Sequence, residues 1–116
     1  MTSLRSEEIG EKYRMQKALE EEQGICALCE RQAIREFSHW KLVENYFPYD
    51  KIAKLHHMLV IKKHLREFEV PEGAWEEFEE IKRDLVNKNY SLILENTPFN
   101  STIPAHLHMH LIVLKD

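Results

Sequence analysis

Residues 104–114 read PAHLHMHLIVL, and this stretch is the most informative part of the sequence. Histidine occupies every second position, at His106, His108 and His110, and apolar residues fill the positions between and after them. A period of two is typical of a β-strand, so we expect three imidazoles on one face and apolar side chains on the other. On a strand, His106 and His110 lie roughly 13 Å apart, which is too far for one tetrahedral ion to bind both. At least one of the three rings therefore has a different role.

The composition indicates one ordinary globular domain. A chain of 116 residues can form one hydrophobic core, and a net charge of -4 gives no general attraction for nucleic acid or an anionic membrane. No apolar run approaches the roughly 18 residues of a membrane span, and the first residues, MTSLRSEEIGEKYR, are too acidic and polar for a secretory signal. We therefore expect a cytoplasmic protein that binds neither membranes nor nucleic acid.

Two of the expected elements are helices. Residues 4–23 are rich in helix formers with solvated charges, and Gly24 is a plausible end of that helix. A second helix is expected from Pro71 or Glu72, because one apolar stripe, widened by Trp75, recurs at helical spacing. That stripe contains Ala74, Phe78, Ile81 and Leu85.

Four segments have the character of strands. They are residues 39–48, residues 54–64, residues 89–97 and residues 105–114, and the last two are joined by the polar turn PFNSTIP. One central helix and a short last connection favour an α+β fold with an antiparallel sheet. Only three glycines are present, which excludes a glycine-rich phosphate loop of the P-loop or Rossmann kind.

The only two cysteines, Cys26 and Cys29, stand in the sequence CALC. Taken alone, they fit a pair of buried apolar residues about as well as a metal site. A lone C-x-x-C in a reducing compartment is more often metal-binding or redox-active than a disulfide. The abundance of histidine favours a closed zinc site of two cysteines and two histidines.

Seven histidines are present, and six of them gather at residues 56–57, 64 and 106–110. A neutral imidazole can attack phosphorus or carbonyl centres, and no Asp or Ser partner in the order of a classical triad is evident. An attacking ring must then be held in one tautomer by a backbone carbonyl or by another histidine. For His39 we expect only a core or exposed position.

The pattern His-φ-His-φ-His-φ-φ, where φ is apolar, closely resembles the signature of the histidine-triad superfamily of nucleotidyl hydrolases and transferases. CALC also stands where many members carry C-x-x-C, and HHMLVIKKH resembles the segment Gly-His-x-Leu-Val-Ile-Pro-Lys-Arg-His of that family. The resemblance covers roughly residues 25–114. It implies a histidine-triad domain at residues 25–116, with a central helix packed on an antiparallel sheet, and an N-terminal helical extension at residues 1–24.

The resemblance implies a role for each matched residue. His108 corresponds to the nucleophile that attacks the α-phosphorus and forms a nucleotidyl-histidine intermediate, and His110 to a contact with the phosphate or the leaving group. His56 aligns with an upstream histidine of the site, although strand parity could select His57 instead. A structural zinc is implied, and its ligands correspond to Cys26, Cys29, His64 and His106.

The phosphate loop departs from the family pattern. Asn96 matches the asparagine at the start of this loop, but the chain continues NTPFNSTIPAH where relatives have a glycine-rich segment and Gly-Gln-Ser. We expect Ser101 and Thr102 to donate hydroxyl hydrogen bonds to phosphate in place of the backbone amides that glycine would expose.

The sequence therefore predicts a nucleotidyl hydrolase or transferase. Its substrate would be a nucleoside phosphate or a phosphoramidate-like nucleotide, and its quaternary structure a homodimer. Two alternatives stay open: a nucleotide-binding regulatory module with little turnover, and an interaction domain whose histidines serve only to bind zinc.

Overall fold

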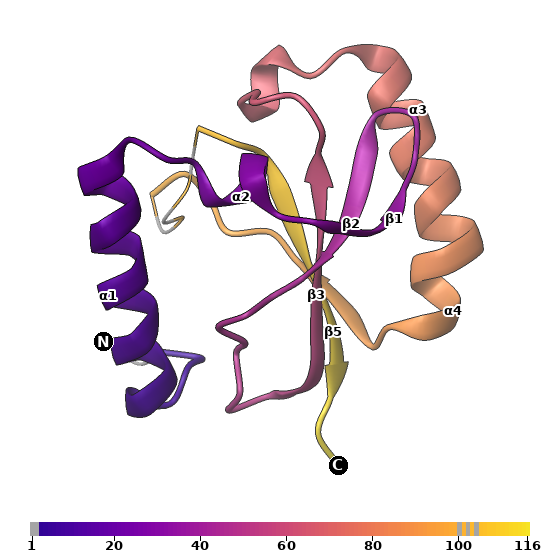
Figure 1. The fold of residues 1–116 in the computed structure, drawn as a ribbon. Coiled ribbons are helices and arrows are strands. Elements are labelled where there is room, and N and C mark those ends of the chain that lie inside the picture. Colours follow the sequence, from indigo (N-terminus) through magenta and orange to yellow (C-terminus); the bar gives the residue numbers. More distant parts are fainter. Residues whose placement is uncertain (1–2, 100, 102, 104) are drawn as a thin grey trace.

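The computed structural model describes residues 3–99, 101, 103 and 105–116, which form one sheet with helices on both faces (Figure 1). Five strands lie in the order β1-β2-β3-β5-β4, and every neighbouring pair is antiparallel. The strands are β1 (Ala33–Glu36), β2 (Trp40–Glu44), β3 (Ala53–Ile61), β4 (Leu92–Leu94) and β5 (His108–Leu114). The helices are α1 (Glu7–Gln23), α2 (Ala27–Glu30), the 3₁₀ turn η1 (Glu67–Glu69), α3 (Glu72–Ile81), the π-helical turn η2 (Lys82–Val86) and α4 (Asn87–Asn89). The α+β prediction with an antiparallel sheet is confirmed.

The larger core lies between the sheet and α3. The Trp40 indole nitrogen donates to the Ala74 carbonyl at 2.7 Å, and its rings pack against Trp75 and Phe78 with centroids 5.7 and 5.5 Å away. Leu59 and other inward side chains of the same sheet face complete this core. Burying these aromatic side chains supplies much of the apolar area that stabilises so short a chain.

The predicted apolar stripe faces the core along α3, but after this helix a different set of positions is buried. Ala74 and Ile81 are buried as expected, whereas Val86 rather than Leu85 is the buried residue near the end. A π-helical turn adds a residue to the helical repeat, so η2 rotates the residues after it by one position. Nothing in the 3.6-residue spacing indicated this turn.

Helices α1 and α2 lie on the other face of the sheet (Figure 1). Leu28 of α2 is fully buried against Val43, Met58 and Val60, so this four-residue helix is held by its one apolar side chain. An isolated helix of this length is unstable in water, and α2 therefore depends on its tertiary contacts.

The predicted N-terminal helix begins at Glu7, because Ser6 accepts from the Ile9 amide and caps it. It ends where Gly24 adopts a left-handed conformation with φ 68°, as expected. The preceding segment is held by a bond from the Lys51 amide to the Leu4 carbonyl, and Tyr13 packs edge-on against Phe47. Only Gly10 of α1 is buried, so the charges of this helix are solvated.

Several strand boundaries differ from the prediction, and β4 is confined to Leu92–Leu94 of the predicted residues 89–97. The strand predicted up to Pro48 ends at Glu44, because the Asn45 side chain accepts from the Phe47 amide and forms a turn. The last strand begins at His108 rather than at residue 105, so His106 precedes it. Strand β1 was not expected, since its residues show no alternation of apolar and polar side chains.

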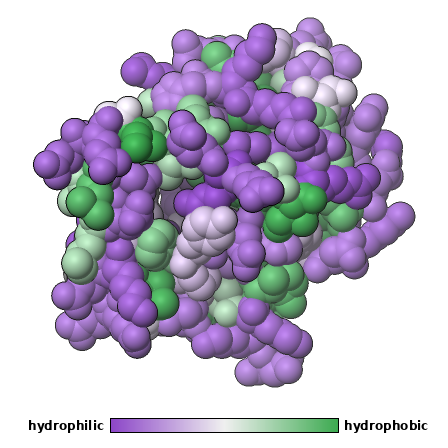
Figure 2. Space-filling model, viewed as in Figure 1, coloured by the Kyte–Doolittle hydropathy of each residue, from purple (hydrophilic) through white to green (hydrophobic). Residues whose placement is uncertain are grey.

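None of the described helices is long and apolar enough to cross a membrane. The face seen in Figure 2 is mostly hydrophilic, and its hydrophobic groups form small separate patches.

Candidate functional site

The pairing of β3 with β5 decides which histidines share a face. His108 lies opposite Val60, His110 opposite Met58 and His56 opposite Ile112, so all three histidines project from the face that carries α1 and α2. His57 projects from the other face, where its Nδ1 lies 2.6 Å from the Tyr90 hydroxyl. His56 is therefore the member of the pair that joins the triad histidines.

His108 is held in one orientation by the backbone. Its Nδ1 donates to the His106 carbonyl at 2.9 Å, and because a carbonyl only accepts, the neutral ring carries its proton on Nδ1. Nε2 is then left with a lone pair. Burial lowers the pKa of His108 and the bond to the His106 carbonyl opposes that shift, so the ring is neutral at neutral pH.

Two cavities meet at His108. The first, of about 590 Å³, lies between α1 and the histidine face and is also lined by His110 and Tyr49. The second, of about 370 Å³, lies beside η1 and the segment that leads to β5. A group bound at His108 can therefore extend in two directions.

His110 and His56 form a buried pair behind this ring. The Tyr49 amide donates to His56 Nδ1 at 3.0 Å, so the proton of His56 is on Nε2, which donates to His110 Nδ1 at 2.8 Å. The remaining nitrogen of His110 lies 3.3 Å from the Tyr49 hydroxyl and can donate to it. Burial lowers the pKa of His56 to about 4 and that of His110 still further, and the nearby charge of Arg5 acts in the same direction. The pair is therefore neutral.

Tyr49 is a site residue that the sequence analysis missed. Its hydroxyl receives hydrogen bonds from the Asn96 side-chain amide at 2.9 Å and from His110, and its ring stacks on His110 with centroids 4.9 Å apart. The phenol keeps a proton to donate into the first cavity, which it lines. No motif marks this tyrosine, because only the turn after β2 brings it to the histidines.

The residues predicted to form the phosphate loop do not all line the same cavity. Asn96 lines both cavities, whereas Ser101 lines only the second and accepts from the Ile103 amide at 3.3 Å. Thr102 lies outside the described residues.

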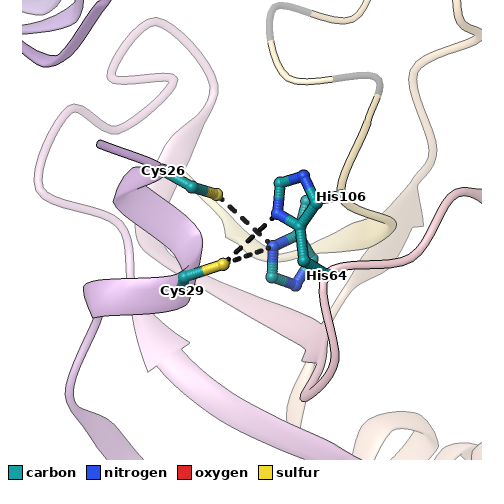
Figure 3. A group of neighbouring side chains, drawn as sticks. All are labelled: Cys26, Cys29, His64 and His106. Atoms are coloured by element: carbon teal, nitrogen blue, oxygen red, sulfur yellow. Dashed lines mark hydrogen bonds between the residues drawn. The ribbon is translucent and has the colours of Figure 1, made fainter. Parts of the chain in front are cut away.

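The four residues predicted as metal ligands form one cluster (Figure 3). One ligand atom from each of Cys26, Cys29, His64 and His106 lies within 4.8 Å of the others. The sulfur of Cys29 is 3.3 Å from His64 Nδ1 and 3.4 Å from His106 Nδ1, and the sulfur of Cys26 is 3.5 Å from His106 Nδ1. The cluster joins α2, the turn after β3 and the segment before β5, and it is compatible with a metal ion.

Hydrogen bonds with the surrounding residues fix the orientation of these side chains. His106 is fully buried, and its Nε2 donates to the Ile61 carbonyl at 2.7 Å, which leaves the Nδ1 lone pair directed at the sulfurs. Lys41, also missed from the sequence, donates to the Cys29 and Arg31 carbonyls at 3.4 and 2.8 Å. Burial, together with the neighbouring Cys26, raises the pKa of the Cys29 thiol to about 11, so metal binding must displace a proton there.

The structure was compared with known proteins. It resembles a HIT family hydrolase from Clostridium thermocellum, with 18% sequence identity, a TM-score of 0.53, and coverage of 84% of this chain and 87% of that chain. A protein named HTC1 shares 14% identity over 97% of this chain and 76% of its own, with a TM-score of 0.47. No protein-family model and no curated protein sequence matches. The chain therefore has a histidine-triad-like fold.

Proposed function

We propose that this protein is a nucleotidyl hydrolase or transferase that acts on a nucleoside phosphate or phosphoramidate through a nucleotidyl-histidine intermediate. One observation carries the proposal: a neutral His108 is fixed through Nδ1 on the His106 carbonyl, with its other nitrogen available where two cavities meet. A nucleophile needs a lone pair, a fixed direction of attack and room for both the incoming and the departing group. The likeness of the fold to a HIT family hydrolase agrees with this chemistry.

The reaction would consist of two displacements at one phosphorus atom. The Nε2 lone pair of His108 forms a bond to phosphorus. On the opposite side of the phosphorus atom the bond to the leaving group breaks, and its electron pair departs with that group. An amine leaving group takes a proton from water and departs. Water or another acceptor then attacks phosphorus and loses a proton to solvent, and the electron pair of the P–N bond returns to Nε2.

Neighbouring groups would assist without forming covalent bonds. The intermediate places a positive charge on the His108 ring, and the carbonyl of His106 accepts from its Nδ1 proton and stabilises that charge. The neutral pair of His110 and His56 adds no competing positive charge, and Tyr49 offers a hydroxyl proton toward the cavity.

We also propose that the metal site binds zinc, which would supply structural crosslinking. A tetrahedral zinc ion with sulfur and nitrogen ligands at about 2.3 and 2.0 Å separates these atoms by roughly 3.5 Å. The three sulfur–nitrogen distances of 3.3 to 3.5 Å agree with that geometry. The cluster, with two thiols and two imidazoles, is also a donor set that zinc prefers.

The test compares wild type with His108→Ala in rapidly quenched reactions on nucleoside phosphoramidates, with detection by intact-mass spectrometry. We expect a nucleotidyl adduct and turnover with wild type, and neither with the variant, whose metal content and melting temperature should be unchanged. His106→Ala is the matched comparison, because it should lose metal and stability first. Full turnover by His108→Ala contradicts the proposal.

A second candidate is a nucleotide-binding module with little turnover. The observation in its favour is the segment NTPFNSTIPAH, which has no glycine where backbone amides would approach phosphate. Tight binding of nucleotide by wild type without adduct or turnover would select this candidate.

A further inference from the structure

One wall of the first cavity carries a positive charge that does not come from the histidines. Arg5, from the segment before α1, lines this cavity together with His108 and His110. Its Nε donates to the Phe47 carbonyl at 2.7 Å, and the guanidinium carbon lies 4.1 Å from the Tyr13 ring centroid and 4.8 Å from that of Tyr49. The side chain is thus held between two aromatic rings and one carbonyl.

This arrangement leaves part of the guanidinium available. No hydrogen bond is found for its two terminal nitrogens among residues 3–99, 101, 103 and 105–116, and no carboxylate of those residues lies within 4.0 Å. Asp50, whose charge raises the pKa of Arg5, accepts a hydrogen bond from the Ser6 amide at 2.6 Å. Burial lowers the pKa of Arg5, which means that this cation has lost water without gaining a full counter-charge.

The charge of Arg5 reaches the histidines. Tyr49 contacts both the guanidinium and His110, and the ring centroid of His110 lies 5.1 Å from that of His108. The positive charge of Arg5 also contributes to the lowered pKa values of both His56 and His110. An anion near Arg5 would therefore lie in the same cavity as the proposed nucleophile.

The other cations of the cavity are less well placed. Lys17 pairs with Glu21 at 3.7 Å, and Glu20 lines the cavity beside them. Arg31 lies over the Tyr46 ring at 3.9 Å, and its Nη1 is enclosed by protein. The wall of the cavity is thus cationic at Arg5, before α1, and acidic farther along that helix at Glu20 and Glu21, which favours phosphate at the Arg5 end.

We propose that Arg5 binds the phosphate group of the nucleotide and replaces, from the N-terminal extension, the donors that a glycine-rich loop would provide. This inference rests on the proposed function, because it concerns the substrate of the same site. Its ligand is a phosphate monoester or diester anion that two guanidinium N–H groups can reach together. The N-terminal extension would thereby form part of the binding site.

The experiment measures the affinity added by phosphate. Calorimetry gives dissociation constants for each nucleoside 5′-monophosphate and for its parent nucleoside, with wild type, Arg5→Gln, Arg5→Lys and Arg14→Ala. Arg14 is the control, because it is exposed on α1, the helix that follows Arg5, and does not line the cavity. Inorganic pyrophosphate serves as a probe without a nucleoside.

We expect Arg5→Gln to weaken monophosphate and pyrophosphate binding by about 10- to 100-fold while nucleoside affinity stays unchanged. Arg5→Lys should retain part of the phosphate contribution, and Arg14→Ala all of it. Salt should weaken monophosphate binding by wild type more than by Arg5→Gln. If Arg5→Gln does not fold, Arg5→Lys still tests the inference. A lysine cannot make a bidentate contact, so full retention of the affinity added by phosphate in Arg5→Lys would contradict such a contact.

The outcomes separate the two proposals. Equal loss of nucleoside and phosphate binding in Arg5→Gln would show a structural role only and overturn this inference. An unchanged phosphate contribution in Arg5→Gln would overturn it and leave the proposed function intact. Wild type that binds nucleotide through Arg5 but forms no adduct would support the inference and contradict catalysis. Wild type that binds neither monophosphates nor pyrophosphate would overturn it as well.

Discussion

At the scale of single residues, the tautomers of the histidines follow from what each ring nitrogen faces. Backbone carbonyls hold His106 and His108, with opposite ring nitrogens protonated in the two residues. His106 therefore directs Nδ1 at the cysteines, whereas His108 keeps Nε2 available to the cavities. Two histidines two positions apart thus differ in role because the backbone presents a carbonyl on different sides of their rings.

The buried pair of His56 and His110 predicts an acid-sensitive fold. The pKa of His56 lies near 4, below its ordinary value of 6.5, because burial disfavours the charged ring. The unfolded chain consequently binds more protons than the folded chain as the pH falls. The contribution of His56 to the free energy of unfolding is therefore fully present above pH 6.5 and is lost as the pH falls toward 4. The shift corresponds to roughly 3 kcal/mol for this residue.

Denaturant unfolding between pH 7 and 4 checks this prediction. His56→Gln should lose part of the pH dependence of the free energy of unfolding, because it removes one of the titrating rings. His39→Gln is the control, since His39 is exposed to solvent beside Glu77 and has no place in the buried pair. An identical pH dependence in wild type and His56→Gln would contradict the prediction.

At the scale of elements, the sequence predicted periodic structure well and irregular structure poorly. Helix α3, the long strand β3 and the sharp end of α1 at Gly24 follow from spacing and from one glycine. The π-helical turn and the early end of β2 depend on contacts that spacing does not report. For the same reason Tyr49 and Arg5 could not be predicted as site residues: both reach the cavity through turns and tertiary packing.

Gly24 links α1 to the first cysteine and requires a left-handed backbone. A Cβ at this position meets nothing within 4 Å, so the cost of Gly24→Ala is backbone strain alone, about 1 kcal/mol. Gly73→Ala is a matched control in the first turn of α3, where a Cβ meets His39 only at ordinary contact distance. We expect Gly24→Ala to lower the free energy of unfolding and Gly73→Ala to leave it equal or raise it. Equal effects of the two substitutions in denaturant unfolding would exclude the strain.

At the scale of the whole molecule, distant segments converge on two adjoining centres. The cysteine–histidine cluster joins residues 26–29, 64 and 106, and the histidine face adds the turn at Tyr49 and the segment at Arg5. The family resemblance predicted the four members of this cluster, and the structure brings them together in an arrangement compatible with a metal site. The homodimer and the boundary between residues 1–24 and 25–116 stay predictions.

Removal of the metal should therefore affect more than the cluster itself. The three segments that the cluster joins contain little regular secondary structure: α2 has four residues, His64 lies in a turn, and His106 precedes β5. A structural ion contributes its binding free energy to folding, so chelation should lower the melting temperature and loosen all three segments together. Because the His106 carbonyl also orients His108, loss of metal should reduce nucleotidyl transfer even though no ligand contacts the phosphate. Hydrogen exchange on metal-loaded and chelated protein measures this, with the core around Trp40 as the internal reference. Unchanged exchange at residues 26–30, 62–65 and 105–108 after complete metal removal would contradict the prediction.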